Sequence, residues 1–175
     1  MKKLGIIICG LVLMMGCERN VYRFSEGSVY GTVYHVSYQS EMDYAVEIRQ
    51  EMERVNRSLS MFNKNSVIAH WNRGESEQVD SLFVAMYEKA REVYEATGGG
   101  FDITVAPLVN AWGFGFKNEK LPSDGKIDSL LQYVGMDKVQ LEGVRLVKLV
   151  EGVQIDASSI AKGLGVDLVA EFFDR

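Results

Sequence analysis

The chain has 175 residues, of which 47% are hydrophobic, and a formal net charge of −5. This composition indicates a globular protein rather than a disordered one. The mild acidity, without any long basic run, argues against a nucleic-acid partner. The two histidines, His35 and His70, are far apart in the sequence, which argues against a histidine-rich zinc site.

Residues 1–16 have the pattern of a signal peptide. Two lysines precede an apolar run, Leu4 to Met15, that is shorter than the roughly 20 residues of a membrane-spanning helix. Met14-Met15-Gly16-Cys17 has the form of a lipobox, which predicts a lipid on Cys17. A plain secretory signal with an incidental cysteine is the alternative. We therefore expect a lipoprotein at the periplasmic side of the cell inner membrane, with residues 17–175 as its folded part.

The cysteines agree with this interpretation. Cys9 would leave with the signal peptide and Cys17 would carry the lipid, so the mature chain would form no internal disulfide. Its stability would then depend on a hydrophobic core, which a chain of this length is able to build.

Two strands are predicted at the start of the mature chain. Val21–Phe24 and Val29–Tyr38 carry the strand pattern, and Glu26-Gly27 is the expected turn between them. Alternation along the second strand places His35 on a half-apolar face, where we expect a structural histidine with a satisfied partner.

Helices are predicted next from apolar spacing and capping residues. The first has a single apolar stripe, and a short second helix places His70 at or near the surface. The third is expected to end before Gly98, and the fourth has a proline in its first turn. The residues that define these helices are Ala45, Ile48, Met52, Val55 and Leu59; Ser66 to Asn72; Asp80 to about Thr97, with Phe83, Met86, Ala90 and Tyr94 facing inward; and Ala106 to Trp112.

The last part of the chain mixes helices with short strands. A helix capped by Ser123 or Asp124 is expected to end at Gly135, and a final helix to run from near Ser158 to Phe173. Between them, three short strands are predicted at Val139–Leu141, Val144–Leu149 and Val153–Ile155. This mixed order of hairpins and helices indicates an α+β fold.

A glycine-rich stretch, TGGGFDITVAPLVNAWGFGF, begins at Thr97. Gly98 accounts for the end of the preceding helix, whereas Gly99 and Gly100 are not needed for it and would let the backbone approach a ligand. A flexible turn in which Asp102 caps the next helix is the alternative. The aromatic residues of Trp112–Phe116 fit either a flavin or nucleotide pocket or the packing of a helix end against the core.

A second stretch, Gln154–Gly163, runs from strand into helix. Lys162 lies in the first turns of that helix, where a cation opposes the helix dipole unless an anion is bound there. A solvated lysine on an ordinary helix is the alternative. Gly163 and Gly165 each cost roughly 1 kcal/mol relative to alanine inside a helix, which a close contact, a bound ion or an exposed bend would explain. The residues alone thus indicate an anionic cofactor, and no pattern for nucleophilic catalysis accompanies them.

Four segments in order match a known family. They are Gly27–Tyr34 (GSVYGTVY), Leu59–Asn63 (LSMFN), Gly98–Gly115 (GGGFDITVAPLVNAWGFG) and Ile155–Asp167 (IDASSIAKGLGVD). On these residues the chain resembles the ApbE family, the FAD:protein FMN transferases, over nearly all of the mature sequence. A lipoprotein signal is also typical of that family.

The resemblance implies an activity and a set of site residues. Such enzymes bind FAD and Mg²⁺ and transfer FMN through its phosphate to a threonine or serine hydroxyl of a target protein, releasing AMP. Tyr30 stands where methionine is common, Phe62 where tyrosine is common, and Gly165 where alanine is common. The implied FAD contacts are Tyr30, Phe62, Gly100, Phe101, Asp102 and Lys162, and the implied metal ligand is the backbone carbonyl of Gly165. No catalytic residue is implied by the matching segments.

The resemblance also implies a difference. Family members continue beyond the final helix into a second half, which supplies aspartate and threonine ligands to Mg²⁺ and a histidine-containing motif. These have no counterpart in this sequence, and Asp156 and Asp167 are not expected to replace them. We therefore expect the N-terminal part of a lipid-anchored flavin transferase. A flavin-binding lipoprotein without catalysis and an FAD pyrophosphatase-like hydrolase are the alternatives.

Overall fold

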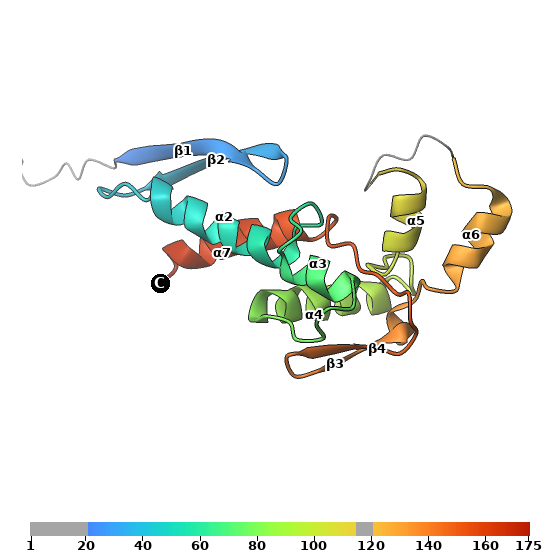
Figure 1. The fold of residues 1–175 in the computed structure, drawn as a ribbon. Coiled ribbons are helices and arrows are strands. Elements are labelled where there is room, and N and C mark those ends of the chain that lie inside the picture. The colour runs from blue at the N-terminus through green and yellow to red at the C-terminus, as the bar shows by residue number, and fades with distance from the viewer. Residues whose placement is uncertain (1–20, 115–120) are drawn as a thin grey trace, which may run out of the picture.

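A computed structural model describes residues 21–114 and 121–175 of the chain (Figure 1). The predicted signal peptide, Cys17, Gly115 and Phe116 lie outside these residues. In the described ranges, no helix is both long and apolar enough to cross a membrane. The elements are β1 (Tyr22–Val29), β2 (Thr32–Gln39), α2 (Ala45–Leu59), α3 (Val67–Asn72), α4 (Ser81–Ala96), α5 (Ala106–Ala111), α6 (Asp124–Leu131), η1 (Met136–Lys138), β3 (Val139–Glu142), β4 (Arg145–Lys148) and α7 (Ala161–Phe173).

The helices and two antiparallel hairpins are arranged in layers (Figure 1). The β1-β2 hairpin lies along α2 and α7, which pack side by side. Helices α3 and α4 continue away from that pair, and the β3-β4 hairpin lies beyond α4. Helices α5 and α6 lie at the far end of the molecule from the free ends of the β1-β2 hairpin. The predicted α+β class is confirmed.

The first hairpin turns at Tyr30-Gly31, so the predicted turn at Glu26-Gly27 is wrong. Both turn residues have positive φ, 53° and 72°, as a two-residue turn between twisted strands requires. Gly27 lies inside β1, opposite Tyr34, whose ring occupies the space that a side chain at residue 27 would need. Gly27 therefore makes room for a cross-strand neighbour and does not end the strand.

His35 is exposed rather than structural. In the hairpin register it pairs with Glu26, and its Nδ1 lies 3.3 Å from the Glu26 carboxylate, with both side chains largely exposed. The expectation of a structural histidine is wrong because Val33 and His35, on this face of β2, are both exposed, although His35 does have a partner in Glu26. His70, as expected, is only partly covered, and it contacts Glu75.

Three boundaries near the C-terminal end differ from the predictions. Helix α6 ends at Leu131 and not at Gly135, because a turn and η1 follow it. Val153–Ile155 is not a strand: it makes a single bridge, between Gln154 and Val105. Helix α7 begins at Ala161 and not near Ser158, since the Ser158 amide donates instead to the Asp156 carboxylate at 2.7 Å.

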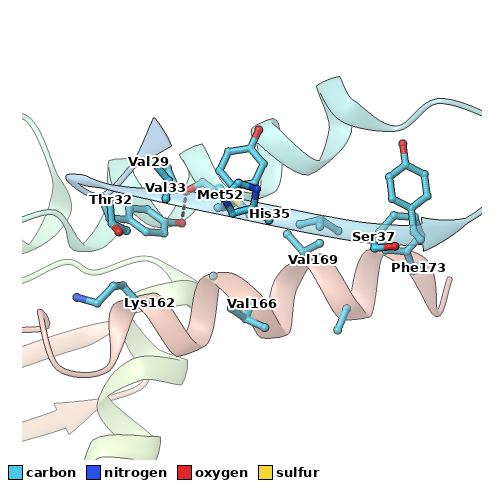
Figure 2. A pocket seen from close by; sticks show the side chains of 16 residues that line it. Val29, Thr32, Val33, His35, Ser37, Met52, Lys162, Val166, Val169 and Phe173 are labelled. Atoms are coloured by element: carbon cyan, nitrogen blue, oxygen red, sulfur yellow. Dashed lines mark hydrogen bonds between the residues drawn. The ribbon is translucent and has the colours of Figure 1, made fainter. Parts of the chain in front are cut away.

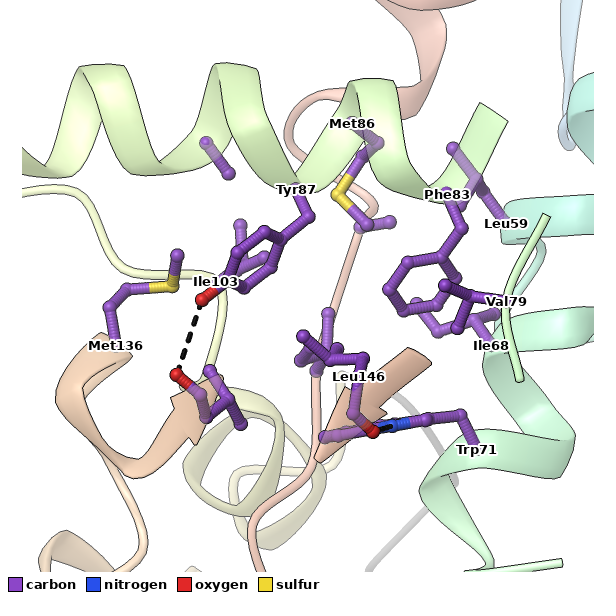
Figure 3. Packing of buried hydrophobic residues seen from close by; sticks show 14 of the residues in the cluster. Leu59, Ile68, Trp71, Val79, Phe83, Met86, Tyr87, Ile103, Met136 and Leu146 are labelled. Carbon is purple, nitrogen blue, oxygen red and sulfur yellow. Dashed lines mark hydrogen bonds between the residues drawn. The ribbon is translucent and has the colours of Figure 1, made fainter. Parts of the chain in front are cut away.

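The main hydrophobic core lies between α3, α4 and the β3-β4 hairpin (Figure 3). Trp71, Phe83 and Tyr87 are almost completely buried in it, and such aromatic side chains bury the most apolar area. The indole nitrogen of Trp71 donates to the Leu146 carbonyl at 2.7 Å, and the Tyr87 hydroxyl donates to the Val139 carbonyl at 3.3 Å. Both aromatic polar groups thus bind β3-β4 and hold that hairpin on the core. The predicted inward positions Phe83, Met86 and Ala90 are confirmed, whereas Tyr94 is half-buried.

A smaller core joins the first hairpin to α2 and α7. Its buried members are Tyr38, Ile48, Met52 and Val169. At one end the Tyr38 ring stacks 4.9 Å from that of Phe173 in a tilted arrangement. This core fixes the hairpin over the two helices and thereby positions its turn near the start of α7.

Candidate functional site

Two adjoining cavities form a groove in the middle of the molecule. One measures about 270 Å³ and the other about 360 Å³, and both are lined by Met61 and Phe62 in the loop between α2 and α3. We call them together the central groove. The first cavity is also lined by Tyr30, Val55, Asn56, Leu59, Ser60, Phe114, Ser158, Ala161 and Lys162, and the second by Lys64, Ala69, Asn72, Arg73, Asn110 and Gln154.

Three of the residues expected to contact FAD meet in the first of these cavities. Tyr30 comes from the hairpin turn, Phe62 from the loop after α2, and Lys162 from the first turn of α7. Phe62 is 71% exposed and Phe114, which lines the same cavity, is 81% exposed, so both rings are open to a ligand. Exposed aromatic faces beside a cation suit a planar, anionic ligand.

Lys162 lies where the structure concentrates positive charge. Its ammonium donates to the Ser158 carbonyl at 3.2 Å, which holds the side chain along the start of α7. The N-terminal end of this 13-residue helix carries a partial positive charge from its aligned peptide dipoles. In the second cavity, Lys64 and Arg73 add cationic side chains, and Arg73 is paired with Glu75. The groove is therefore suited to an anion.

Tyr30 and Gly165 are in direct contact. A Cβ atom at Gly165 would lie 2.8 Å from the Tyr30 hydroxyl, so only glycine leaves room for this ring. The hydroxyl donates to the Met52 carbonyl in α2 at 2.6 Å. Burial, and to a smaller extent the nearby Glu53 carboxylate, raises the pKa of Tyr30. Tyr30 is thus neutral at physiological pH and connects the hairpin turn, α2 and α7.

Gly100, Phe101 and Asp102 do not line the central groove. Phe101 packs against the main core, and the Gly100 amide donates to the Thr97 carbonyl at 3.2 Å. One oxygen of Asp102 accepts from the Thr104 amide and hydroxyl at 2.7 and 2.6 Å, and so Asp102 does not cap α5. Gly98, as expected, follows the end of α4 with φ of 60°.

The two glycine-containing motifs are nevertheless joined by the backbone. The Asp156 amide donates to the Ile103 carbonyl at 2.7 Å, and Gln154 forms its bridge with Val105. The segment after Asp102 therefore runs beside the segment that leads into Lys162. The structure brings the motifs together, with Tyr30, Phe62 and Lys162 lining the groove and residues 100–102 outside its lining.

A larger cavity of about 590 Å³ lies between β2 and α7 (Figure 2). We call it the hairpin cavity. Val33, Val166 and Val169 line it, and Lys162 lies at one end, next to the central groove. Tyr30 and Lys162 also line this cavity, but Phe62 does not, so the central groove, where all three meet, is the better candidate site. Gly165 faces this cavity beside Tyr30.

The described residues contain no cluster of metal-ligating side chains. Among them no group of three His, Cys, Asp or Glu side chains is close enough to hold a metal ion. Mg²⁺ prefers octahedral oxygen ligands, including carboxylates, and the Gly165 carbonyl alone does not supply these.

Several groove residues were not singled out from the sequence. Met61 lies within a matching segment but carried no assigned role, and Asn72 and Arg73 gave no signal of a site. Phe114 and Gln154 lie in the two stretches that were singled out, and the structure places both in the groove lining. Asn72 contacts a backbone segment far along the chain, and such a contact leaves no local sequence pattern.

Comparison with known proteins identifies the family. The ApbE family model matches residues 30–175. Curated relatives named FAD:protein FMN transferase include those of Vibrio cholerae, 30% identical over 98% of this chain and 55% of the relative, and Haemophilus influenzae, 33% identical over 100% of this chain and 57% of the relative.

Solved structures agree with the family match. The flavin transferase ApbE from Vibrio cholerae superposes with a TM-score of 0.83 at 29% identity, covering 89% of this chain and 54% of that one. The apo flavinyl transferase ApbE of Pseudomonas stutzeri gives 0.82 at 27% identity, covering 89% and 53%. The chain thus spans about half the length of the relatives it matches. Its sequence and its fold both place this chain in the ApbE family.

Proposed function

We propose that this chain carries the FAD-binding part of an FAD:protein FMN transferase. The observation that carries the proposal is the meeting of Tyr30, Phe62 and Lys162 in one cavity of a chain that belongs to the ApbE family. The relatives of this chain support the proposal, because they are named FAD:protein FMN transferase. That name implies two substrates, FAD and a protein acceptor.

The groove residues would bind and orient FAD. Phe62 and Phe114 offer exposed rings against which a flat heteroaromatic ring can stack. The Lys162 ammonium, at the positive end of α7, would attract the pyrophosphate and stabilise the negative charge that grows on it during transfer. Because phosphoryl transfer depends mainly on positioning and on charge stabilisation, these roles suit the reaction.

The proposed reaction is a displacement at phosphorus. The acceptor hydroxyl oxygen attacks the FMN phosphorus of FAD, the bond from that phosphorus to the bridging oxygen breaks, and AMP leaves with the bridging oxygen. The hydroxyl proton is released. Neither His35 nor His70 lines the central groove, and no described residue is assigned as the base.

A requirement for Mg²⁺ is part of the proposal and rests on the family resemblance alone. The Gly165 carbonyl is the single ligand that the resemblance implies in this chain. The proposal predicts that a chelator abolishes AMP release and that added Mg²⁺ restores it.

The test is an assay of both products. The purified chain is incubated with FAD and a threonine-bearing acceptor protein, with and without Mg²⁺, and AMP, free FMN and acceptor fluorescence are followed. AMP with a fluorescent acceptor supports transfer. AMP with free FMN and an unlabelled acceptor would instead indicate an FAD pyrophosphatase-like hydrolase.

A flavin-binding protein without catalysis is the second candidate. The observation that favours it is the lack of a three-ligand metal group in the described residues. Saturable FAD binding without any AMP would identify this function.

Lys162→Met tests the groove itself. Hydrogen bonds to charged groups are worth about 1.5–3 kcal/mol, so this variant should bind FAD at least about tenfold more weakly. Lys89→Met, which removes an exposed lysine on α4 paired with Glu92, is the matched control and should leave affinity unchanged. Equal FAD affinity in the two variants would remove Lys162 from the site.

We further propose that the protein is lipid-anchored through Cys17 at the periplasmic side of the inner membrane. Support comes from the lipobox-like sequence, which lies outside the described residues. Labelled fatty acid should be incorporated into the protein and not into a Cys17→Ser variant. An unlabelled wild-type protein recovered in the soluble periplasmic fraction would show a plain secretory signal.

A further inference from the structure

Asn72, the last residue of α3, bonds to a distant backbone segment through both atoms of its amide. Its Nδ2 donates to the Ile155 carbonyl at 2.8 Å, and its Oδ1 accepts from the Ile155 amide at 2.8 Å. The side chain thus takes the place of a neighbouring strand, with one donor and one acceptor. Among the side chains of similar size, only an amide offers both in this arrangement at neutral pH.

The segment that Asn72 holds is also bonded to the chain around residues 103–110, where Asn110 donates to the Gln154 side chain at 3.4 Å. On its opposite side, Gln154 forms a bridge with Val105, and the Asp156 amide donates to the Ile103 carbonyl at 2.7 Å. Ile155 itself is fully buried. The segment is therefore fixed between residues 103–105 and Asn72, and loss of the Asn72 amide would release one side of it.

This segment leads directly into the cationic start of α7. The Ala157 carbonyl accepts from the Ala161 amide at 2.8 Å, and Lys162 donates to the Ser158 carbonyl at 3.2 Å. The position of Lys162 therefore depends on where residues 155–158 are held.

Asn72 also touches the opposite wall of the groove. Its Nδ2 lies 3.8 Å from the Met61 sulfur, and Met61 precedes Phe62 in the loop shared by both cavities. The backbone of Asn72 is itself held, since Lys148 donates to its carbonyl at 3.1 Å while lying over the Trp71 ring. One anchored side chain thus contacts both the loop that carries Phe62 and the segment that carries Lys162.

We propose that Asn72 is a positioning residue that sets the spacing between the Phe62 wall and the Lys162 wall of the central groove. This inference rests on the proposed function of the groove as the FAD site. Asn72 need not touch FAD for this role, because it acts through Ile155 and Met61.

The experiment compares substitutions at Asn72 with a matched core variant. Asn72→Asp loses the donor to Ile155, and Asn72→Gln keeps donor and acceptor on a stem longer by one methylene. Ile68→Val, in the same helix, removes one methyl group from a fully buried side chain that faces the core. FAD affinity is measured by flavin fluorescence, folding by circular dichroism and urea midpoint, and backbone protection by amide hydrogen exchange.

Both Asn72 variants should bind FAD at least about tenfold more weakly, because Phe62 and Lys162 would no longer be held at the right spacing. Ile68→Val should change FAD affinity by no more than about twofold. Wild-type affinity in a folded Asn72→Asp or Asn72→Gln variant would overturn the proposal. If Asn72→Asp does not fold, Asn72→Gln decides by the same comparison.

Failure of the proposed function gives a different result. If the wild-type chain binds no FAD, the function is wrong, and amide exchange still decides the role of Asn72. Faster exchange over residues 155–162 in an Asn72 variant than in Ile68→Val supports the positioning role. Equal exchange in the two overturns it.

Discussion

Tyr30 and Gly165, far apart in the sequence, meet where the hairpin turn crosses α7. The resemblance singles out both positions, and the structure relates them to each other. The larger Tyr30 ring takes the space that a side chain at residue 165 would fill, and its hydroxyl binds the Met52 carbonyl. The two residues therefore form one packing unit.

Gly165→Ala should lower the free energy of unfolding by up to about 2 kcal/mol, because the methyl group would press on the Tyr30 hydroxyl at a cost of about 1–3 kcal/mol while alanine gains about 1 kcal/mol in the helix. Tyr30→Met, with its flexible side chain, should relieve that clash, so the double variant should be more stable than the sum of the single changes predicts. Urea unfolding of the four proteins measures this coupling. Strictly additive effects would show that the two positions are independent.

Glu75 provides a test by pH. Hydrogen bonds from Arg73, and then from His70, lower the pKa of this carboxyl from 4.5 to about 2. A carboxyl whose pKa is lower in the folded than in the unfolded state stabilises the fold at every pH above its unfolded pKa. For Glu75 this stabilisation is lost as the pH falls from about 4.5 toward about 2. The effect is small because all three side chains are about half exposed and solvent screens their charges. The stability difference between wild type and Glu75→Gln should therefore shrink between neutral pH and about pH 3. A difference that stays constant over this range would contradict the shift.

At the scale of elements, those set by local patterns were predicted best, and they include the short strands β3 and β4, whose bounds lie within one residue of the predicted ones. The apolar stripe of α2 and the Asp80 cap of α4 are local patterns, and the structure has both helices close to the expected bounds. The hairpin turn was misplaced because tyrosine rarely adopts positive φ, so Gly27 looked like the better turn residue than Tyr30. Val153–Ile155 has the composition of a strand, but one of its neighbours is the Asn72 side chain. No local pattern reveals such a partner.

The cap of α4 also connects two helices. One Asp80 oxygen accepts from the Phe83 amide at 2.8 Å and from the hydroxyl of Ser58, a fully buried residue of α2, at 2.7 Å. Asp80→Ala should therefore cost more than the ~0.5–2 kcal/mol of a lost cap, because the Ser58 hydroxyl is left without an acceptor.

Adding Ser58→Ala to Asp80→Ala should recover part of that loss, since no unpaired hydroxyl then remains buried. Thermal unfolding of the two single variants and the double variant measures the recovery. A double variant less stable than the Asp80→Ala protein would show that the Ser58 hydroxyl is not the source of the extra cost.

At the scale of the whole molecule, the site is built from segments that the sequence keeps apart. Tyr30, Phe62 and Lys162 were singled out by resemblance, and each comes from a different element. Their convergence depends on the small core that positions the hairpin and on the backbone pairing that positions the start of α7. Neither is visible in one stretch of sequence, and for that reason the groove lining beyond the matching motifs was not predicted.

The hairpin cavity leaves apolar side chains open to solvent, with Val166 65% exposed. An apolar surface of this kind should bind an apolar fluorescent dye such as anilinonaphthalene sulfonate. Val166→Glu should reduce the dye fluorescence. Val46→Glu, at a position 64% exposed on α2 and outside the cavity, is the matched control and should reduce it much less. Equal fluorescence in the two variants would mean that the dye binds elsewhere.

The central claim is that the central groove binds FAD. The most direct measurement is a titration of the isotope-labelled chain with FAD, followed by backbone amide resonances. Saturable shifts concentrated at Met61, Phe62 and the start of α7 are predicted, and Lys162→Met should weaken them. The absence of saturable shifts, or shifts confined to residues outside the groove, would contradict the claim.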